Sequence, residues 1–315
     1  MLALAQERSE FADDAQTRGA GQVATRGPFR VACVVAVVFF VLITLLLSVP
    51  LLSVGAREVI SDVGLMPVAA LVPVTCLWAA RRSHGALRLG GALLGSAGIL
   101  WTLGEVGWFV AHYLWSDAGA SVADVFYLAA VVPAAAALVV LPPKGAEGRA
   151  RVISLLGCLV AGGSVLFVAW SIILRTPLPT EAPPELAVLT AYPVADVVLL
   201  ALALSAVIRS GNQVRPPMRL VAAGVATYAV ADTVYSIQSS LDLYTAGSPV
   251  DLGWFAGYLL IALAALHPVT GTQRAQVPGL QHGGLASLLG YIPIAVATLV
   301  AASPRRCHPQ NPIRS

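Results

Sequence analysis

Two acidic residues, Glu105 and Asp232, lie inside long apolar stretches and are the residues of this chain best suited to chemistry. Each acid has aromatic residues four positions before it and three positions after it, which places carboxylate and rings on one face of a helix. Such a face suits either a pocket for a cation or polar small molecule, or hydrogen bonds that join helices. The candidate ligand-binding set is Glu105, Asp232, Trp101, Trp108, Tyr228 and Tyr235.

Other polar residues of the apolar stretches have structural interpretations. His112 lies on the same helical face as Glu105, but a single histidine near a membrane surface is usually structural. Four aspartates begin even-numbered predicted helices, where a first-turn carboxylate caps free N–H groups and meets the positive end of the helix dipole. These aspartates are Asp62, Asp124, Asp196 and Asp251.

The chain contains no pattern typical of an enzyme or of a metal site. Phosphate-binding loops, HExxH and GxSxG motifs are missing from the sequence, and the cysteines show neither CxxC nor Cys/His spacing. Free cysteines in apolar runs are usually core residues. We interpret the four cysteines as structural; they are Cys33, Cys76, Cys158 and Cys307. We therefore predict no catalytic residue, no metal site and no cofactor.

Composition predicts that membrane-spanning helices position the two acids. Hydrophobic residues make up 57% of the chain, charged residues 11%, and the mean hydropathy is +0.80. Because backbone polar groups in lipid must be paired internally, the apolar runs predict an all-α, polytopic membrane helix bundle with about nine spans. The predicted spans are residues 31–53, 62–80, 89–114, 123–141, 152–174, 191–208, 218–241, 251–266 and 285–302.

The distribution of basic residues predicts the topology. Fourteen Lys and Arg residues fall on one side of the predicted spans and only Arg57 and Arg175 on the other. Basic residues mark cytoplasmic loops, so residues 1–30 form a disordered cytoplasmic tail before the transmembrane domain of residues 31–302. We expect a multi-pass protein of the bacterial cytoplasmic (inner) membrane with a cytoplasmic N-terminus. The small net charge of +3 indicates the lipid bilayer as its partner and not a nucleic acid.

Residues 303–315 do not follow this rule. They would be external after nine spans, yet they carry Arg305, Arg306 and Arg314, and their composition changes abruptly from the apolar run before them. We expect a disordered tail that marks a truncation or a frame error.

An internal repeat relates two parts of the chain. A shift of 127 positions aligns Trp101 with Tyr228 and Glu105 with Asp232 without a gap, so the third and fourth predicted spans resemble the seventh and eighth. A shift of 72 gives a looser third copy in the fifth and sixth spans. Repeated helix hairpins occur in transporters and in membrane sensors, so the repeat does not choose between these functions.

Three stretches, Ala191–Leu204, Val225–Ile237 and Ser248–Pro268, resemble the N-terminal membrane region of bacterial GGDEF/EAL proteins of cyclic-di-GMP signalling. Similar regions precede some sensor histidine kinases. The resemblance covers about Leu89–Leu299. In that family a tenth helix, a linker helix and a cytoplasmic GGDEF domain follow, and none of them is present in this sequence. The resemblance therefore implies a sensor region whose catalytic output domain is absent.

These observations favour an integral membrane sensory or regulatory module that is not an enzyme and that binds a small-molecule signal on the external side, or a partner. The alternative is a small-solute permease, favoured by the repeated hairpins and by Glu105 and Asp232. A third interpretation is a purely structural membrane partner, in which both acids would tolerate alanine. The sequence leaves the ligand and the oligomeric state open.

The charge distribution predicts which loops a membrane-impermeant thiol reagent reaches in intact cells. In a variant without native cysteines, Pro183→Cys should react and Gly145→Cys should react only after the cells are opened. The opposite pattern would show that the topology is inverted.

Overall fold

The computed structural model describes most of the predicted membrane region as helices. Among the residues that it describes there is no strand, and six helices are long and apolar enough to cross a membrane. A seventh, Asp251–Leu266, is apolar but shorter. The described residues are 27–48, 52–115, 122–141, 183–241 and 243–268.

The described helices correspond to seven of the nine predicted spans. The other two predictions, residues 152–174 and 285–302, lie outside the described residues, as do tail residues 1–26 and 303–315. A count of nine is therefore not supported by the described part of the chain. The elements are the helix Gly27–Ser48, α2 (Val54–Arg81), α3 (Gly85–Val110), a π-helical turn η1 (Ala111–Trp115), α4 (Val122–Val140), α6 (Pro183–Arg209), α7 (Arg215–Ser240) and α8 (Asp251–Leu266).

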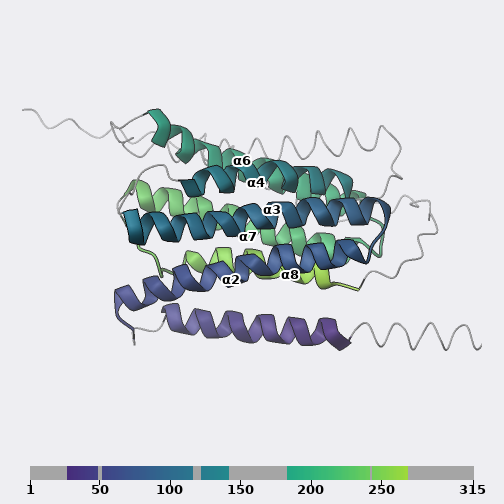
Figure 1. Ribbon diagram of the computed structural model, residues 1–315, viewed down its shortest axis with the longest axis horizontal. Helices are drawn as coiled ribbons and strands as arrows, with labels where there is room; N and C mark the ends of the chain where they lie inside the picture. The colour runs from purple at the N-terminus through teal and green to yellow at the C-terminus, as the bar shows by residue number, and fades with distance from the viewer. Residues whose placement is uncertain (1–26, 49–51, 116–121, 142–182, 242, 269–315) are drawn as a thin grey trace, which may run out of the picture.

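Six of these helices lie roughly parallel to one another (Figure 1), and their contacts close into a ring. In order around the ring, α2 packs on α3, α3 on α4, α4 on α6, α6 on α7, α7 on α8, and α8 on α2. The first unit, α2–α3–α4, and the second unit, α6–α7–α8, thus have the same order of neighbours. The helix Gly27–Ser48 packs beside α8, with the rings of Phe39 and Phe255 6.1 Å apart.

The outer surface of the ring is apolar. Large hydrophobic side chains such as Val74, Val132 and Val230 are more than half exposed, although they lie in the middle of helices. Monomeric soluble proteins rarely expose continuous apolar surface of this extent. Together with the six spanning-length helices, this surface identifies a membrane protein.

Two helices, α2 and α6, begin eight residues earlier than predicted, and this corrects the role of two aspartates. Helix α2 begins at Val54, where the Ser53 hydroxyl accepts a hydrogen bond from the Ala56 N–H at 3.3 Å. Helix α6 begins at Pro183. Asp62 and Asp196 therefore lie inside helices, and the prediction that they cap them is wrong. Hydropathy marks where a helix meets lipid, whereas a helix can continue beyond that boundary into water.

The other two aspartates lie where the sequence predicts them. Asp124 is in the first turn of α4, and Asp251 is in the first turn of α8. The C-terminal end of α8 also agrees, since the helix stops at Leu266 before His267 and Pro268. Burial lowers the pKa of His267, so its imidazole is neutral near pH 7. A neutral imidazole therefore adds little electrostatic stabilisation at the negative, C-terminal end of α8.

Small residues bring the helices close together. A Cβ added to Gly95 of α3 would lie 2.7 Å from the Leu77 side chain of α2. A Cβ on Gly224 of α7 would lie 2.9 Å from the Gly257 carbonyl oxygen of α8. Backbones this close exclude any larger residue, which is how small residues permit helix packing in lipid.

Gly257→Ala should destabilise the protein, because the added methyl group overlaps the ring of Tyr228 on α7. We expect a loss of about 1–3 kcal/mol in the free energy of unfolding, as for other overpacked cores. Denaturant titration in detergent micelles measures it. The matched control is Gly55→Ala in α2, where no atom lies within 4 Å of the added methyl. If both variants were equally stable, α7 and α8 would not be packed as described.

Candidate functional site

Glu105 lies where the two units meet. Its side chain on α3 is buried, with 8% of the residue exposed. One carboxylate oxygen accepts a hydrogen bond from the Tyr258 hydroxyl of α8 at 2.7 Å. Tyr127 of α4 also hydrogen-bonds to this carboxyl group. A buried carboxylate requires such donors, so Glu105 joins one helix of the second unit to two helices of the first.

Three aromatic rings surround this contact. Trp101 of α3 and Tyr228 of α7 are stacked, with centroids 5.9 Å apart and planes 15° apart. The ring of Tyr258 lies edge-on to Tyr228 at 5.0 Å and to Trp101 at 6.3 Å. Edge-to-face and offset-stacked rings at these distances attract one another. The interface between the units is therefore aromatic, with one acid at its edge.

The stacked pair also indicates how the units are related. Trp101 and Tyr228 are equivalent under the shift of 127 positions, and equivalent residues touch each other only near a symmetry axis. The matching order of neighbours around the ring agrees with this. The contact between these equivalent residues is what an approximate twofold relation between the two units would produce.

Asp232 is bound in a similar way within the second unit. Its carboxylate accepts a hydrogen bond from the Trp254 indole N–H of α8 at 2.6 Å. Trp254 is 127 positions after Tyr127, so each acid receives a donor from the equivalent position of the next helix in its own unit. The repeat therefore conserves an acid and its aromatic donor, and not only a pattern of apolar residues.

Asp196 on α6 adds a second carboxyl group to Asp232. The two carboxyl groups lie close together inside the bundle, and two carboxylates in such a place repel each other unless a proton or a cation lies between them. Asp196 is 8% exposed, and one of its oxygens is buried with no hydrogen-bond partner in the described part of the chain.

The structure brings together part of the predicted set of six residues. Trp101, Tyr228 and Glu105 meet at the interface between the units, and Tyr235 packs on Trp254, the donor to Asp232, at 5.7 Å. Trp108 is different, because it stacks on His112 with centroids 6.1 Å apart. Ligand binding by any of the six remains a prediction.

Sequence reasoning missed four participants. Tyr127 and Trp254 could have been found, since the shift of 127 aligns one with the other beside the aligned acids. The equivalent of Tyr258 is Val131, so the repeat carries no signal for this tyrosine. The remaining one, Asp196, was interpreted as a helix cap.

A second polar cluster surrounds Asp251 at the start of α8. Its carboxylate accepts hydrogen bonds from the Ser61 hydroxyl of α2 at 2.5 Å, the Gly247 N–H at 2.7 Å and the Tyr244 hydroxyl at 3.0 Å. Gly247 has φ +79°, a conformation that favours glycine. Burial and the nearby Asp251 carboxylate raise the pKa of Tyr244, which stays protonated as a donor. This cluster fixes α2, the loop before α8, and α8.

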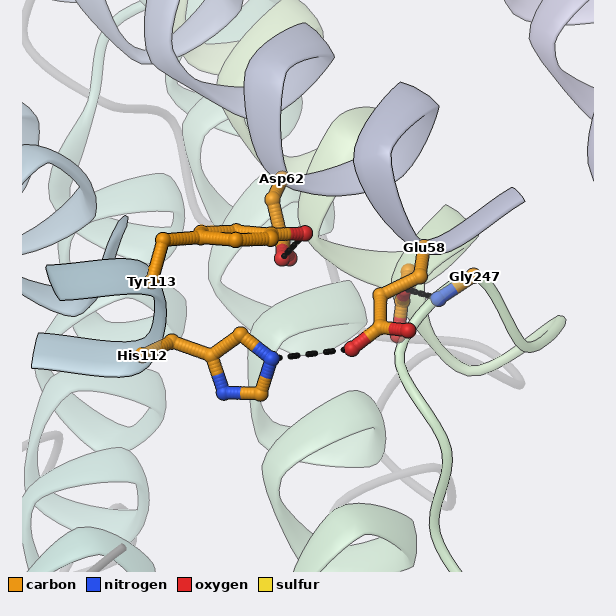
Figure 2. A network of polar contacts seen from close by, with 6 residues as sticks. Glu58, Asp62, His112, Tyr113 and Gly247 are labelled. Atoms are coloured by element: carbon orange, nitrogen blue, oxygen red, sulfur yellow. Dashed lines mark hydrogen bonds and ion pairs between the residues drawn. The ribbon is translucent and has the colours of Figure 1, made fainter. Parts of the chain in front are cut away.

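Next to it lies a group of three further side chains, Glu58, Asp62 and His112 (Figure 2). The His112 Nε2 is 2.9 Å from the Glu58 Oε1, and the Tyr113 hydroxyl donates to Asp62 at 3.0 Å. Each of the three side chains offers one metal-ligand atom, and these atoms lie within 4.8 Å of one another. The prediction of no metal site considered only motifs close in sequence, and it overlooked this cluster.

No family model, curated protein or solved structure matches this chain.

The hydrogen bond between Glu105 and Tyr258 can be measured by a double-mutant cycle of Glu105→Gln and Tyr258→Phe. We expect a coupling free energy of about 0.6–1.7 kcal/mol, the range found for hydrogen bonds between membrane helices. Unfolding in micelles measures each stability. A control cycle pairs Glu105→Gln with Ser96→Ala, since the Ser96 hydroxyl donates to the Ala92 carbonyl of its own helix at 3.0 Å. Additive effects in the first cycle would contradict the described contact.

Proposed function

We propose that this protein is a membrane-embedded sensory or regulatory module that detects a proton or a small cation between its two three-helix units. The supporting observation is the Glu105–Tyr258 hydrogen bond beside the Trp101–Tyr228 stack. A cation or a proton on Glu105 would neutralise the carboxylate and weaken the hydrogen bond that it accepts from the Tyr258 hydroxyl. A weaker bond would loosen the contact between the units and change their packing.

Several features of the site support a signal-binding role. A carboxylate with aromatic rings around it is a favourable environment for a small cation. The unpartnered oxygen of Asp196, beside Asp232, offers a second acceptor close to the same interface. An ionisable residue within a membrane bundle is expensive, and such residues usually serve a function.

The proposal also covers the number of spans, the side of the membrane on which the N-terminus lies, and the membrane itself. We keep nine spans, a cytoplasmic N-terminus and a bacterial inner-membrane location as parts of it, on the basis of hydropathy and basic residues. The resemblance to the membrane regions of GGDEF/EAL signalling proteins fits a sensory role. No enzymatic activity is proposed for the chain.

A small-solute permease is the second candidate, and the twofold arrangement of two three-helix units favours it. Some transporters consist of parallel repeats related by an axis along the membrane normal, with the substrate site between the repeats. Glu105 and Asp232 would then bind the transported cation. The two candidates differ in whether an ion crosses the membrane.

Proteoliposomes that contain the full chain can separate the two candidates. The probes are protons, followed with a trapped pH dye, and sodium ions, followed by uptake. For a sensory module we expect no flux above that of empty liposomes, together with a change in tryptophan fluorescence on acidification, since Trp101 lies at the interface. Glu105→Gln should remove that change, whereas the control Ser96→Ala should keep it.

Proton or sodium flux that Glu105→Gln abolishes would instead establish a permease. If neither flux nor a fluorescence response occurred, and if Glu105→Ala and Asp232→Ala matched the wild type, the protein would be a structural partner. Each result thus selects one of the three interpretations.

A further inference from the structure

Three side chains of metal-ligand type converge where α2 begins and α3 ends, away from the Glu105 interface. Glu58 and Asp62 are four residues apart on α2, so both lie on one face of the helix. His112 reaches them from η1, and Figure 2 shows its ring directed at Glu58. Their ligand atoms lie within 4.8 Å of one another, and the closest pair is 2.9 Å apart.

The charges at this point are not balanced by the protein. Asp62 is 7% exposed and Asp251 1%, and Glu58 is half-buried beside them. Among the described residues, the one basic side chain within 4.0 Å of these carboxylates is His112, beside Glu58, and its imidazole carries a charge only when it is protonated. Arg57, although adjacent in sequence, donates to the Leu47 carbonyl instead. Buried carboxylates without a cation are costly, so the cluster favours binding of a positive ion.

Asp62 itself has room for a ligand. One of its oxygens accepts the Tyr113 hydroxyl at 3.0 Å, and in the described structure the other oxygen has no hydrogen bond. Asp251 differs, because both of its oxygens are bonded by Ser61, Tyr244 and Gly247. The unbonded oxygen of Asp62 is therefore the carboxylate acceptor most available to an ion at this cluster.

The local backbone presents the histidine to this acceptor. Helix α3 continues into the π-helical turn η1, and such turns occur often at functional sites. Stacking on Trp108 supports the ring of His112, while 42% of its side chain is exposed, which leaves an entry path from water. Tyr113, the next residue, holds Asp62, as outer-shell donors hold metal ligands.

We propose that Glu58, Asp62 and His112 form a binding site for a divalent transition-metal ion of the zinc type. Zinc binds imidazole nitrogen and carboxylate oxygen at about 2.0–2.2 Å, which puts tetrahedral ligand atoms about 3.4 Å apart. The His112 Nε2 and the Glu58 Oε1 are 2.9 Å apart, and all three ligand atoms lie within 4.8 Å of one another, so they are close enough to share one ion. Magnesium and calcium prefer oxygen ligands only, and the imidazole therefore selects against them.

Three protein ligands leave a fourth position for water or a solute. The site belongs to the first unit alone, because Ser239 takes the place of His112 under the shift of 127 positions. A bound ion would connect α2 to the end of α3 and stabilise the first unit, and its three ligands do not include Glu105. The inference therefore does not rest on the proposed sensory function.

Zinc affinity of the full chain in detergent tests the site, measured by competition with a chromophoric chelator. We expect Glu58→Gln, Asp62→Asn and His112→Gln each to weaken one zinc site by at least about 10- to 100-fold. The matched control is His84→Gln, a histidine at the other end of α3, which should leave the affinity unchanged. Tyr113→Phe keeps all three ligands and should weaken binding by about tenfold.

Cobalt and thermal unfolding give readouts besides affinity. Cobalt bound at the site should show the visible absorption of a four-coordinate ion, and zinc should raise the Tm of the wild type and of His84→Gln but not of His112→Gln. Size-exclusion profiles identify variants that fail to fold. If Asp62→Asn does not fold, Glu58→Gln tests the site in its place, because Glu58 is only half-buried. Equal zinc affinity in the wild type and in the folded ligand variants would overturn the proposal.

Discussion

The need to satisfy a buried carboxylate in an apolar bundle organises the centre of this protein. Glu105 cannot reach water from its position between the helices, so protein groups must donate to it. Tyr258 and Tyr127 do so from α8 and α4. Since these donors come from both units, the interface between the units depends on one acid. A residue that is costly in lipid thereby fixes the relative positions of three helices.

The two repeated units share the position of a buried acid and its aromatic donor but differ in the acid's other partners. Both units place an acid on their middle helix and an aromatic donor on the following helix, as in Glu105 with Tyr127 and Asp232 with Trp254. The two acids differ in their further partner, because Asp232 meets a second carboxyl group from Asp196 of its own unit, whereas Glu105 meets the Tyr258 hydroxyl of the other unit. The two units therefore differ in the groups that surround their buried acids.

Close helix packing makes these polar contacts short enough to form. In lipid no hydrophobic effect drives helices together, so small residues and hydrogen bonds must hold them. Gly257 sits against the ring of Tyr228, and Gly104 against the ring of Tyr127, so a larger residue at either glycine would displace a ring of the site. The glycines and the polar network are thus parts of one arrangement.

The sequence alone determined the class of the protein and most of its helices, because hydropathy and helix length are local properties. It also determined the repeat and the burial of Glu105, since an acid in an apolar run must face the interior of a bundle. Only the tertiary structure decided which groups meet. Tyr258 is 153 positions from Glu105, and His112 is 54 positions from Glu58, so no local pattern joins them. Such contacts depend on how helices pack, which is a property of the assembled bundle.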